Sequence, residues 1–285
     1  MTRSATRFLL AASFLLAISS GSLAQMGTDE LLKKMIEAQG GTERLSDIRT
    51  AVLKGTMILV AQGGVSGGIT ITNAFPDRTL IEMELAGTKI AQGYDGKIAW
   101  MDNPLAGGYA ELPEAQAESM RREASGFGAL VAPEEFGISY NYRGIETDAG
   151  VEYHVLEQIF GAEDVTAVYV DVNTFLIHKT KTVTGSLTQP IVSETHLADY
   201  RETDGIKQAH QVSSFSNDQE IARYLFDHVV YNVEVDDAIF KGARKRFTKK
   251  ELITDARQLA AIIEDTHPDP YKHIGGKIAF HRRLQ

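Results

Sequence analysis

The chain contains no cysteine among its 285 residues. Disulfide bonds and thiol chemistry are therefore excluded. For the same reason, no cysteine near the N-terminus can carry a lipid anchor. A protein without cysteine is compatible with export to a bacterial periplasm as well as with any other compartment.

Long apolar runs are also scarce. The longest, residues 8–18, is too short to span a membrane, which takes about 20 residues. Arg3 and Arg7 precede this run, and Ser22-Leu23-Ala24 follows it with small residues at the positions of a cleavage site. This order predicts a cleavable signal peptide over residues 1–24 and a periplasmic location. An uncleaved N-terminal membrane anchor is the alternative.

Positive charge is in short supply. The chain has 29 Lys and Arg against 38 Asp and Glu, for a net charge of −9. Loss of residues 1–24, which hold two Arg and no acid, would bring the net charge to −11. Nucleic acids require a basic face, and so does tight binding to anionic lipid surfaces, so neither partner is expected.

Motifs for catalysis and for cofactors are missing as well. The sequence has no glycine-rich nucleotide motif and no H-E-x-x-H motif. Its eight His are scattered without the spacing of a zinc site, so we expect neither a metal nor a cofactor. Residues 64–68 match G-x-S-x-G around Ser66, but a strand pattern follows, whereas a nucleophile elbow leads into a helix. We interpret this match as a hairpin loop.

What the sequence has in abundance is strand pattern. From about Thr50, apolar and polar residues alternate with the period of half-buried strands. Turn residues such as Asp95-Gly96 separate the runs. Strands are predicted at 50–61, 68–75, 78–86, 88–94, 97–102, 151–160, 164–171, 174–184, 190–200, 207–216 and 225–235. Short consecutive strands with tight turns predict a mainly β (α+β) domain over residues 25–240, built on a curved antiparallel sheet of about eleven strands.

Helical spacing occurs in three places. A helix is predicted from Thr28, with Leu31 and Met35 on its apolar stripe, and another is predicted within residues 113–131. After a basic linker, a capping box at Thr248 begins a C-terminal helix. We predict that residues 241–285 form a linker and helical stub that is separate from the β domain.

Apolar residues on successive strands suggest a wide apolar face on one side of the sheet. Two interpretations remain open: a core packed fully under the helices, or a cavity that the helices fill only in part. The residues predicted to line such a cavity are Ile58, Val60, Ile69, Ile71, Ile81, Met83, Leu85 and Trp100.

Several segments resemble periplasmic LolA-like proteins. They are residues 37–41 with Leu45 and Ile48, residues 75–78, residues 93–97 with Trp100, and residues 200–205. The resemblance covers about residues 25–220. It implies a half-open antiparallel barrel of about eleven strands, with helices over an apolar cavity. LolA and LolB carry the acyl chains of lipoproteins between membranes. Without a lipidation cysteine, this chain resembles the soluble LolA type.

The tail resembles the N-terminal helix of tail-specific (C-terminal-processing) serine peptidases. The similarity rests on Asp255, Leu259, residues 262–264, residues 267–271 and Phe280. The catalytic Ser and Lys of that family have no counterpart before Gln285. The resemblance therefore implies a truncated stub without catalytic residues.

Two functions follow as hypotheses. The first is a non-enzymatic periplasmic carrier or sensor that binds acyl chains of a lipid or lipoprotein in an apolar cavity. The second is an accessory domain of an exported serine peptidase, which binds a peptide or an envelope protein at an exposed strand edge. Hydrolysis through Ser66 is a distant third.

Overall fold

The computed structural model describes residues 26–161, 164–186 and 188–242. The predicted signal peptide (1–24) and the predicted C-terminal helix lie outside these residues. All but the first two residues of the predicted linker lie outside them as well.

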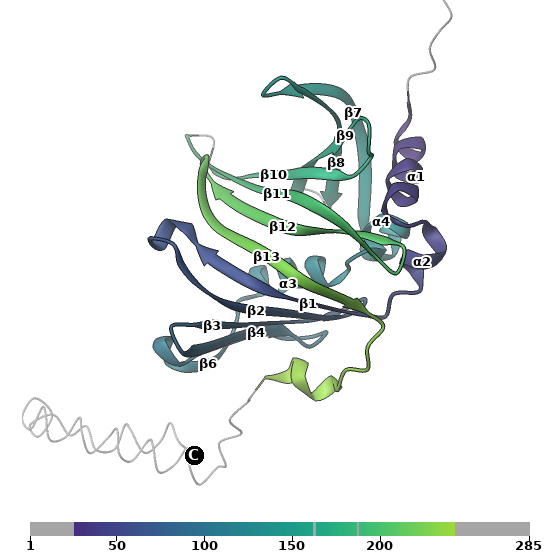
Figure 1. Cartoon of the computed structure of the whole chain (residues 1–285). Helices are drawn as coiled ribbons and strands as arrows, with labels where there is room; N and C mark the ends of the chain where they lie inside the picture. The colour runs from purple at the N-terminus through teal and green to yellow at the C-terminus, as the bar shows by residue number, and fades with distance from the viewer. Residues whose placement is uncertain (1–25, 162–163, 187, 243–285) are drawn as a thin grey trace, which may run out of the picture.

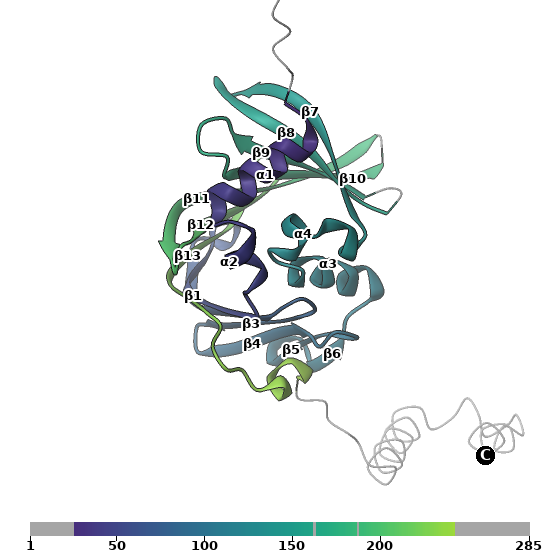
Figure 2. The ribbon, with the colours of Figure 1, turned by 90° about the vertical axis from the view of Figure 1, so that its right-hand side faces the viewer.

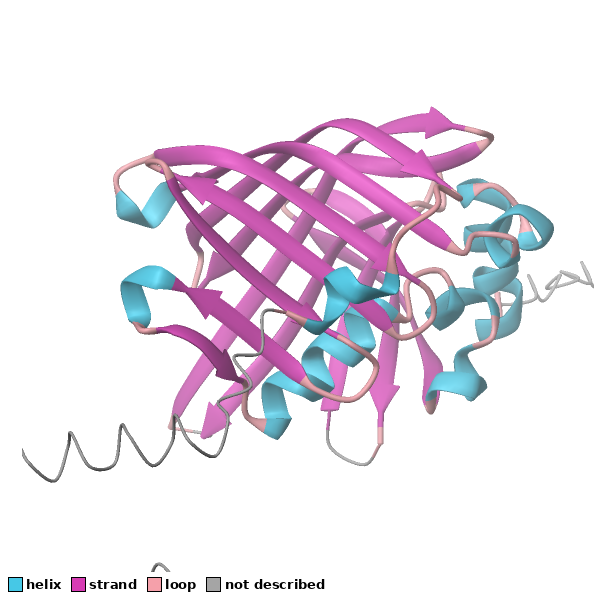
Figure 3. Cartoon of the chain, turned by 90° about the horizontal axis from the view of Figure 1, so that it is seen from below, coloured by secondary structure: helices cyan, strands magenta, loops and turns pink. Residues whose placement is uncertain are grey.

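One large antiparallel sheet forms the body of the described chain (Figures 1 and 3). Its order is β6-β5-β4-β3-β2-β1-β13-β12-β11-β10-β9-β8-β7. A sheet of this size curls, and here it curves into a trough with two free edges. The strands are β1 (Thr50–Leu59), β2 (Val65–Ala74), β3 (Arg78–Leu85), β4 (Thr88–Tyr94), β5 (Ala99–Asn103), β6 (Gly108–Glu111), β7 (Ile138–Asp148), β8 (Val151–Phe160), β9 (Asp164–Asp171), β10 (Ile177–Ser186), β11 (Gln189–Thr203), β12 (Ile206–Ser216) and β13 (Gln219–Tyr231).

The helices gather at the open side of the trough (Figure 2). Four are α-helical: α1 (Thr28–Gln39), α2 (Thr42–Ser46), α3 (Glu114–Ala124) and α4 (Gly128–Val131). Four short 3-10 turns complete the described part: η1 (Val60–Gln62), η2 (Pro104–Ala106), η3 (Pro133–Phe136) and η4 (Asp237–Lys241).

The predicted mainly β fold with a curved antiparallel sheet is confirmed, but the strand count is thirteen rather than about eleven. The two additional strands, β6 and β7, are the two edges of the sheet. β6 has only four residues, and much of β7 is exposed. Their sequences therefore show a weaker burial pattern than the central strands do.

The helical insertion is the connection between these two edges. Because β6 and β7 are consecutive in the chain but at opposite ends of the sheet, α3 and α4 must cross the opening. At one side, Ala117 and Met120 of α3 pack on Tyr94 and Ala99. At the other side, Arg122 pairs with Asp164 at the start of β9. The insertion therefore spans the trough from side to side.

A tight turn follows α3. Gly126 has a φ of +52°, and a Cβ atom there would lie 2.1 Å from Cε1 of Phe75. Only glycine fits this backbone conformation and this close approach. The predicted helix over 113–131 is consequently divided into α3 and α4.

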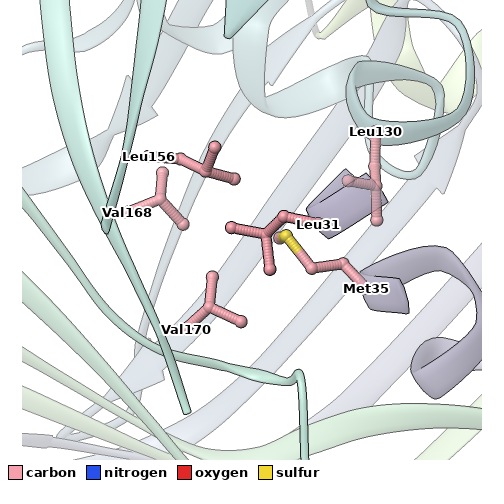
Figure 4. Packing of buried hydrophobic residues seen from close by; sticks show 6 residues of the cluster. All are labelled: Leu31, Met35, Leu130, Leu156, Val168 and Val170. Carbon is pink, nitrogen blue, oxygen red and sulfur yellow. The ribbon is translucent and has the colours of Figure 1, made fainter. Parts of the chain in front are cut away.

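Helix α1 packs on β8 and β9, and Figure 4 shows the residues of this contact. Its residues Leu31 and Met35 are 0% and 2% exposed, and they pack with Leu130 of α4. The remaining buried members of this cluster come from β8 and β9: Leu156, Val168 and Val170. Burying this apolar stripe fixes the helix on the sheet.

The end of the described chain packs on the outer face of the sheet. Phe240 in η4 is 0% exposed and contacts Leu80 and Trp100. The Trp100 indole Nε1 donates a hydrogen bond of 2.6 Å to the Phe240 carbonyl oxygen. Arg78 pairs with Asp237 of the same turn. The β domain thus includes residues up to Gly242, where a Cβ atom would lie 2.6 Å from Trp100.

Phe240→Ala should lower the free energy of unfolding by about 3–5 kcal/mol, because it opens a cavity between η4 and the sheet. Ile239→Ala is the matched control, since Ile239 is 39% exposed. Its effect should stay below about 1 kcal/mol. Chemical denaturation of both variants measures the difference, and equal effects would show that η4 does not stabilise the sheet.

Candidate functional site

A cavity of about 300 Å³ lies between the sheet and the crossing helices. Its size is at the low end of ligand pockets in proteins. Its floor comes from strands on both halves of the trough, and its roof comes from α1, α3 and α4. The apolar lining residues are Met35, Ala51, Leu53, Phe75, Phe127, Ala129, Leu130, Val168 and Ile177.

Two tyrosines line this cavity, and their hydroxyl groups differ in environment. The Tyr140 hydroxyl donates to the Ala129 carbonyl at 3.0 Å and accepts from Gln158 at 2.7 Å. Tyr231 is 8% exposed, and its hydroxyl has no hydrogen-bond partner among the described residues. Burial raises the pKa of each phenol to about 12, so both are neutral donors. A buried donor without a partner is costly, which marks Tyr231 as a polar group available to a ligand.

Glu123 on α3 brings the only charge to the described lining of the cavity. Glu123 keeps a solvent-accessible surface. Desolvation by the surrounding protein raises the pKa of its carboxyl, and the charge of the neighbouring Arg122 opposes the rise. Arg122 itself pairs with Asp164 and lies over the Phe160 ring at 4.9 Å. No described residue forms a hydrogen bond or ion pair with the Glu123 carboxylate.

Five of the eight predicted cavity residues lie together on the concave face. They belong to the apolar cluster around buried Met57, Ile69 and Phe226. None of the eight lines the cavity itself, but Leu53 packs against this cluster and also lines the cavity, so the two adjoin. The five are Ile69, Ile71, Ile81, Met83 and Leu85. Cross-strand pairs Ile69–Met83 and Ile71–Ile81 hold them side by side.

The other three predicted residues lie elsewhere, which corrects the sequence-based placement. Ile58 follows Met57 on β1, so the alternation of the strand turns it to the opposite face. Val60 lies in η1, beyond the end of the strand. Trp100 packs under Phe240 on the outer face.

The polar groups of the cavity were missed by the sequence analysis. Glu123 lies on an amphipathic helix rich in acids, where one more Glu carries no signal. Tyr231 resembles any other aromatic residue at the end of a strand. Only the tertiary structure reveals that they line one space.

A second polar cluster lies on the outer face of the sheet. Lys179 is 6% exposed, and its Nζ lies 2.6 Å from Asp148 and 3.5 Å from Glu194. Glu194 also contacts Lys181 at 3.0 Å and His196 at 2.9 Å. Every charge in this cluster is paired, which indicates a structural role.

Within the described residues, no three His, Asp or Glu side chains are grouped so that they could hold a metal ion. The described helices include none that is long and apolar enough to cross a membrane.

Comparison with known proteins finds similarity at the level of structure alone. No family model and no curated protein matches the sequence. A DUF1329 family protein from Desulfovibrio piger superposes with a TM-score of 0.54 at 12% identity, over 75% of this chain and 97% of the other. A LolA superfamily protein from Nitrosomonas europaea gives 0.51 at 12% identity, over 75% and 97%. The chain has a LolA-like fold.

A third structure has the same fold. It is a domain from Vibrio parahaemolyticus that is provisionally assigned to outer membrane lipoprotein sorting. It superposes with a TM-score of 0.51 at 13% identity, over 74% of this chain and 94% of the other. At these identities the likeness concerns the fold. The LolA-like architecture predicted from the sequence is therefore confirmed, while the resemblance of the tail to peptidases concerns residues outside the described part.

Tyr231→Phe should leave the free energy of unfolding unchanged or raise it by about 1 kcal/mol, because it removes a buried hydroxyl without a partner. Tyr140→Phe is the matched control, since it removes a hydroxyl that makes two hydrogen bonds. It should lower the stability by about 1–2 kcal/mol. Equal losses in denaturant titrations would contradict the assignment of an unpaired hydroxyl to Tyr231.

The outer cluster predicts a dependence of stability on pH. Burial opposes ionisation of Glu194, but hydrogen bonds from His196 and Lys181 and the charge of Lys179 outweigh it and lower the pKa of Glu194 to about 2. The ionised group therefore stabilises the fold above its ordinary pKa of 4.5, and this contribution disappears as the pH falls towards about 2.

Glu194→Gln should accordingly cost about 2 kcal/mol near neutral pH, and the gap from the unmodified protein should close below pH 4.5. Glu152→Gln removes an acid from an exposed position on β8 and should cost less than about 0.5 kcal/mol. Unfolding measured across the pH range tests this, and a gap that persists in acid would refute it.

Proposed function

We propose that this protein is a periplasmic, non-enzymatic carrier or sensor that binds acyl chains of a lipid or lipoprotein. The observation that carries the proposal is the cavity of about 300 Å³, which adjoins the apolar concave face at Leu53. The LolA-like fold supports it, since two of the similar structures are named for LolA or for lipoprotein sorting. The predicted signal peptide supports a periplasmic location.

The energetics of such binding follow from burial of apolar area. An acyl chain in the trough would gain about 25 cal/mol for each Å² removed from water. Ile71, Ile81 and Met83 are only partly buried in the free protein, so they offer apolar area that a chain can cover. The fully buried residues of the α1 cluster hold the helix in place and offer no such area.

Binding can be measured directly. Protein purified from cells should release acyl lipid that mass spectrometry detects, and it should bind a fluorescent fatty-acid probe that unlabelled lipid displaces. A protein that holds no lipid and binds no probe would overturn the proposal.

Ile81→Glu should abolish binding of the probe. An unpaired carboxylate covered by an acyl chain costs several kcal/mol, so the affinity should fall at least about 100-fold. Ile221→Glu introduces the same charge at a position that is 40% exposed and outside the concave cluster, and it should bind the probe normally. Circular dichroism of both variants controls for folding, and equal affinities would contradict binding on the concave face.

A second candidate function rests on the free edge of β7. This strand of eleven residues pairs only with β8, and Ile145 on it is 56% exposed. A peptide or envelope protein could extend the sheet there, as an accessory domain of an exported serine peptidase would require. Hydrogen-exchange protection of β7 by such a partner, without protection of the trough, would favour this function over the carrier.

A further inference from the structure

The polar groups of the cavity determine which amphiphile it can accept. Among the described residues that line it, Glu123 is the only one with a charged side chain, and no Lys, Arg or His accompanies it. An anionic head group would be repelled by the negative charge of an ionised Glu123, and no positively charged side chain in the described lining would offset that repulsion. The same lining supplies amides from Gln39, Asn73 and Gln208, which are neutral.

Several polar side chains in this space have no hydrogen-bond partner among the described residues, and two of them differ from the neutral amides. The Glu123 carboxyl lies on the helical roof and forms no hydrogen bond with a described residue, while its neighbour Arg122 is engaged by Asp164. The Tyr231 hydroxyl comes from the sheet floor, is buried, and has no partner in the described chain. A carboxylate accepts only, and a phenol can donate and accept. Each can therefore accept a hydrogen bond from a polar group that carries an N–H or O–H donor.

Glu123 lines the cavity from α3. Burial, and after it the charge of Glu123, raises the pKa of Tyr224 on β13, which packs against the apolar cluster around Met57 and Phe226. An amphiphile with its chain on that cluster could thus present its polar end to α3.

We propose that the cavity selects acyl compounds whose polar group is a hydrogen-bond donor without negative charge, such as an amide, a hydroxyl or an ammonium group, and rejects free fatty acids. Glu123 accepts the hydrogen bond of that group, and the Tyr231 hydroxyl is its second partner. This inference rests on the proposed function, because it assigns the polar end of the same ligand.

The test uses three probes with the same saturated chain and different ends: a carboxylate, a primary amide and an ammonium group. Each competes with a fluorescent alkyl probe for the protein, and the comparison is repeated from neutral to mildly alkaline pH. The unmodified protein should bind the amide and the ammonium compound at least about tenfold more tightly than the carboxylate, as expected for a hydrogen bond to a charged acceptor.

Glu123→Gln should remove this discrimination by strengthening binding of the carboxylate and weakening binding of the ammonium compound. Glu114→Gln makes the same change of net charge on the same helix, outside the cavity lining, and should keep the selectivity of the unmodified protein. Tyr231→Phe should weaken the amide probe more than the fluorescent alkyl probe.

The outcomes separate the two proposals. If all three probes bind and Glu123→Gln leaves their ranking unchanged, the assignment of Glu123 is wrong and the carrier function stands. If Glu114→Gln changes the ranking as much as Glu123→Gln does, the effect is one of overall charge and the inference also fails. If no alkyl probe binds at all, the carrier function itself is overturned.

Discussion

The architecture depends on one constraint of topology. A single antiparallel sheet of thirteen strands has two edges, and here the edges are β6 and β7, which follow one another in the chain. The segment between them must therefore cross the open side of the trough. It does so as α3 and α4, fixed at one end by packing on Tyr94 and at the other by the ion pair of Arg122 with Asp164. The roof of the cavity is thus a consequence of how the sheet is ordered.

The same crossing leaves part of the trough unfilled. Helix α1 packs on β8 and β9, α2 packs through Leu45 on β1, β12 and β13, and α3 packs on β4 and β5. No described helix contributes to the apolar cluster around Met57 and Phe226 on the concave face. The close approach of Gly126 to Phe75 fixes the turn between α3 and α4. What remains is a cavity with a mixed lining, to which α3 contributes Glu123 and β13 contributes Tyr231.

The two faces of the sheet carry different kinds of interaction. On the outer face, Phe240 covers Trp100, and Lys179 is paired with Asp148 and Glu194. On the concave face, Ile81 and Met83 stay partly exposed, and the Tyr231 hydroxyl lacks a partner within the described chain. Unsatisfied groups concentrated on one face are what a binding surface requires.

The local sequence pattern determined much of the fold of this protein. The alternation in residues such as Ile69, Ile71, Ile81 and Met83 predicted both the strands and the shared face, because strand period and turn chemistry are local properties. None of the eight residues predicted to line a cavity lies in the lining of the cavity itself, and three of them lie outside the concave cluster for reasons that local pattern cannot contain. The side chain of Ile58 points to the other face of the sheet, and Val60 lies beyond the end of its strand. Trp100 packs against Phe240, which is 140 residues away in the chain.

Tertiary structure alone decided the rest. The edge strands β6 and β7 follow weak patterns because edges bury little. Glu123 and Tyr231 acquire their significance only when the fold brings both to one cavity, since one exposed acid and one strand-end aromatic carry no signal in the sequence. The sequence by itself determined the curved sheet and its apolar face, whereas the crossing of the chain between the two edges decided where a cavity remains and which polar groups enter it.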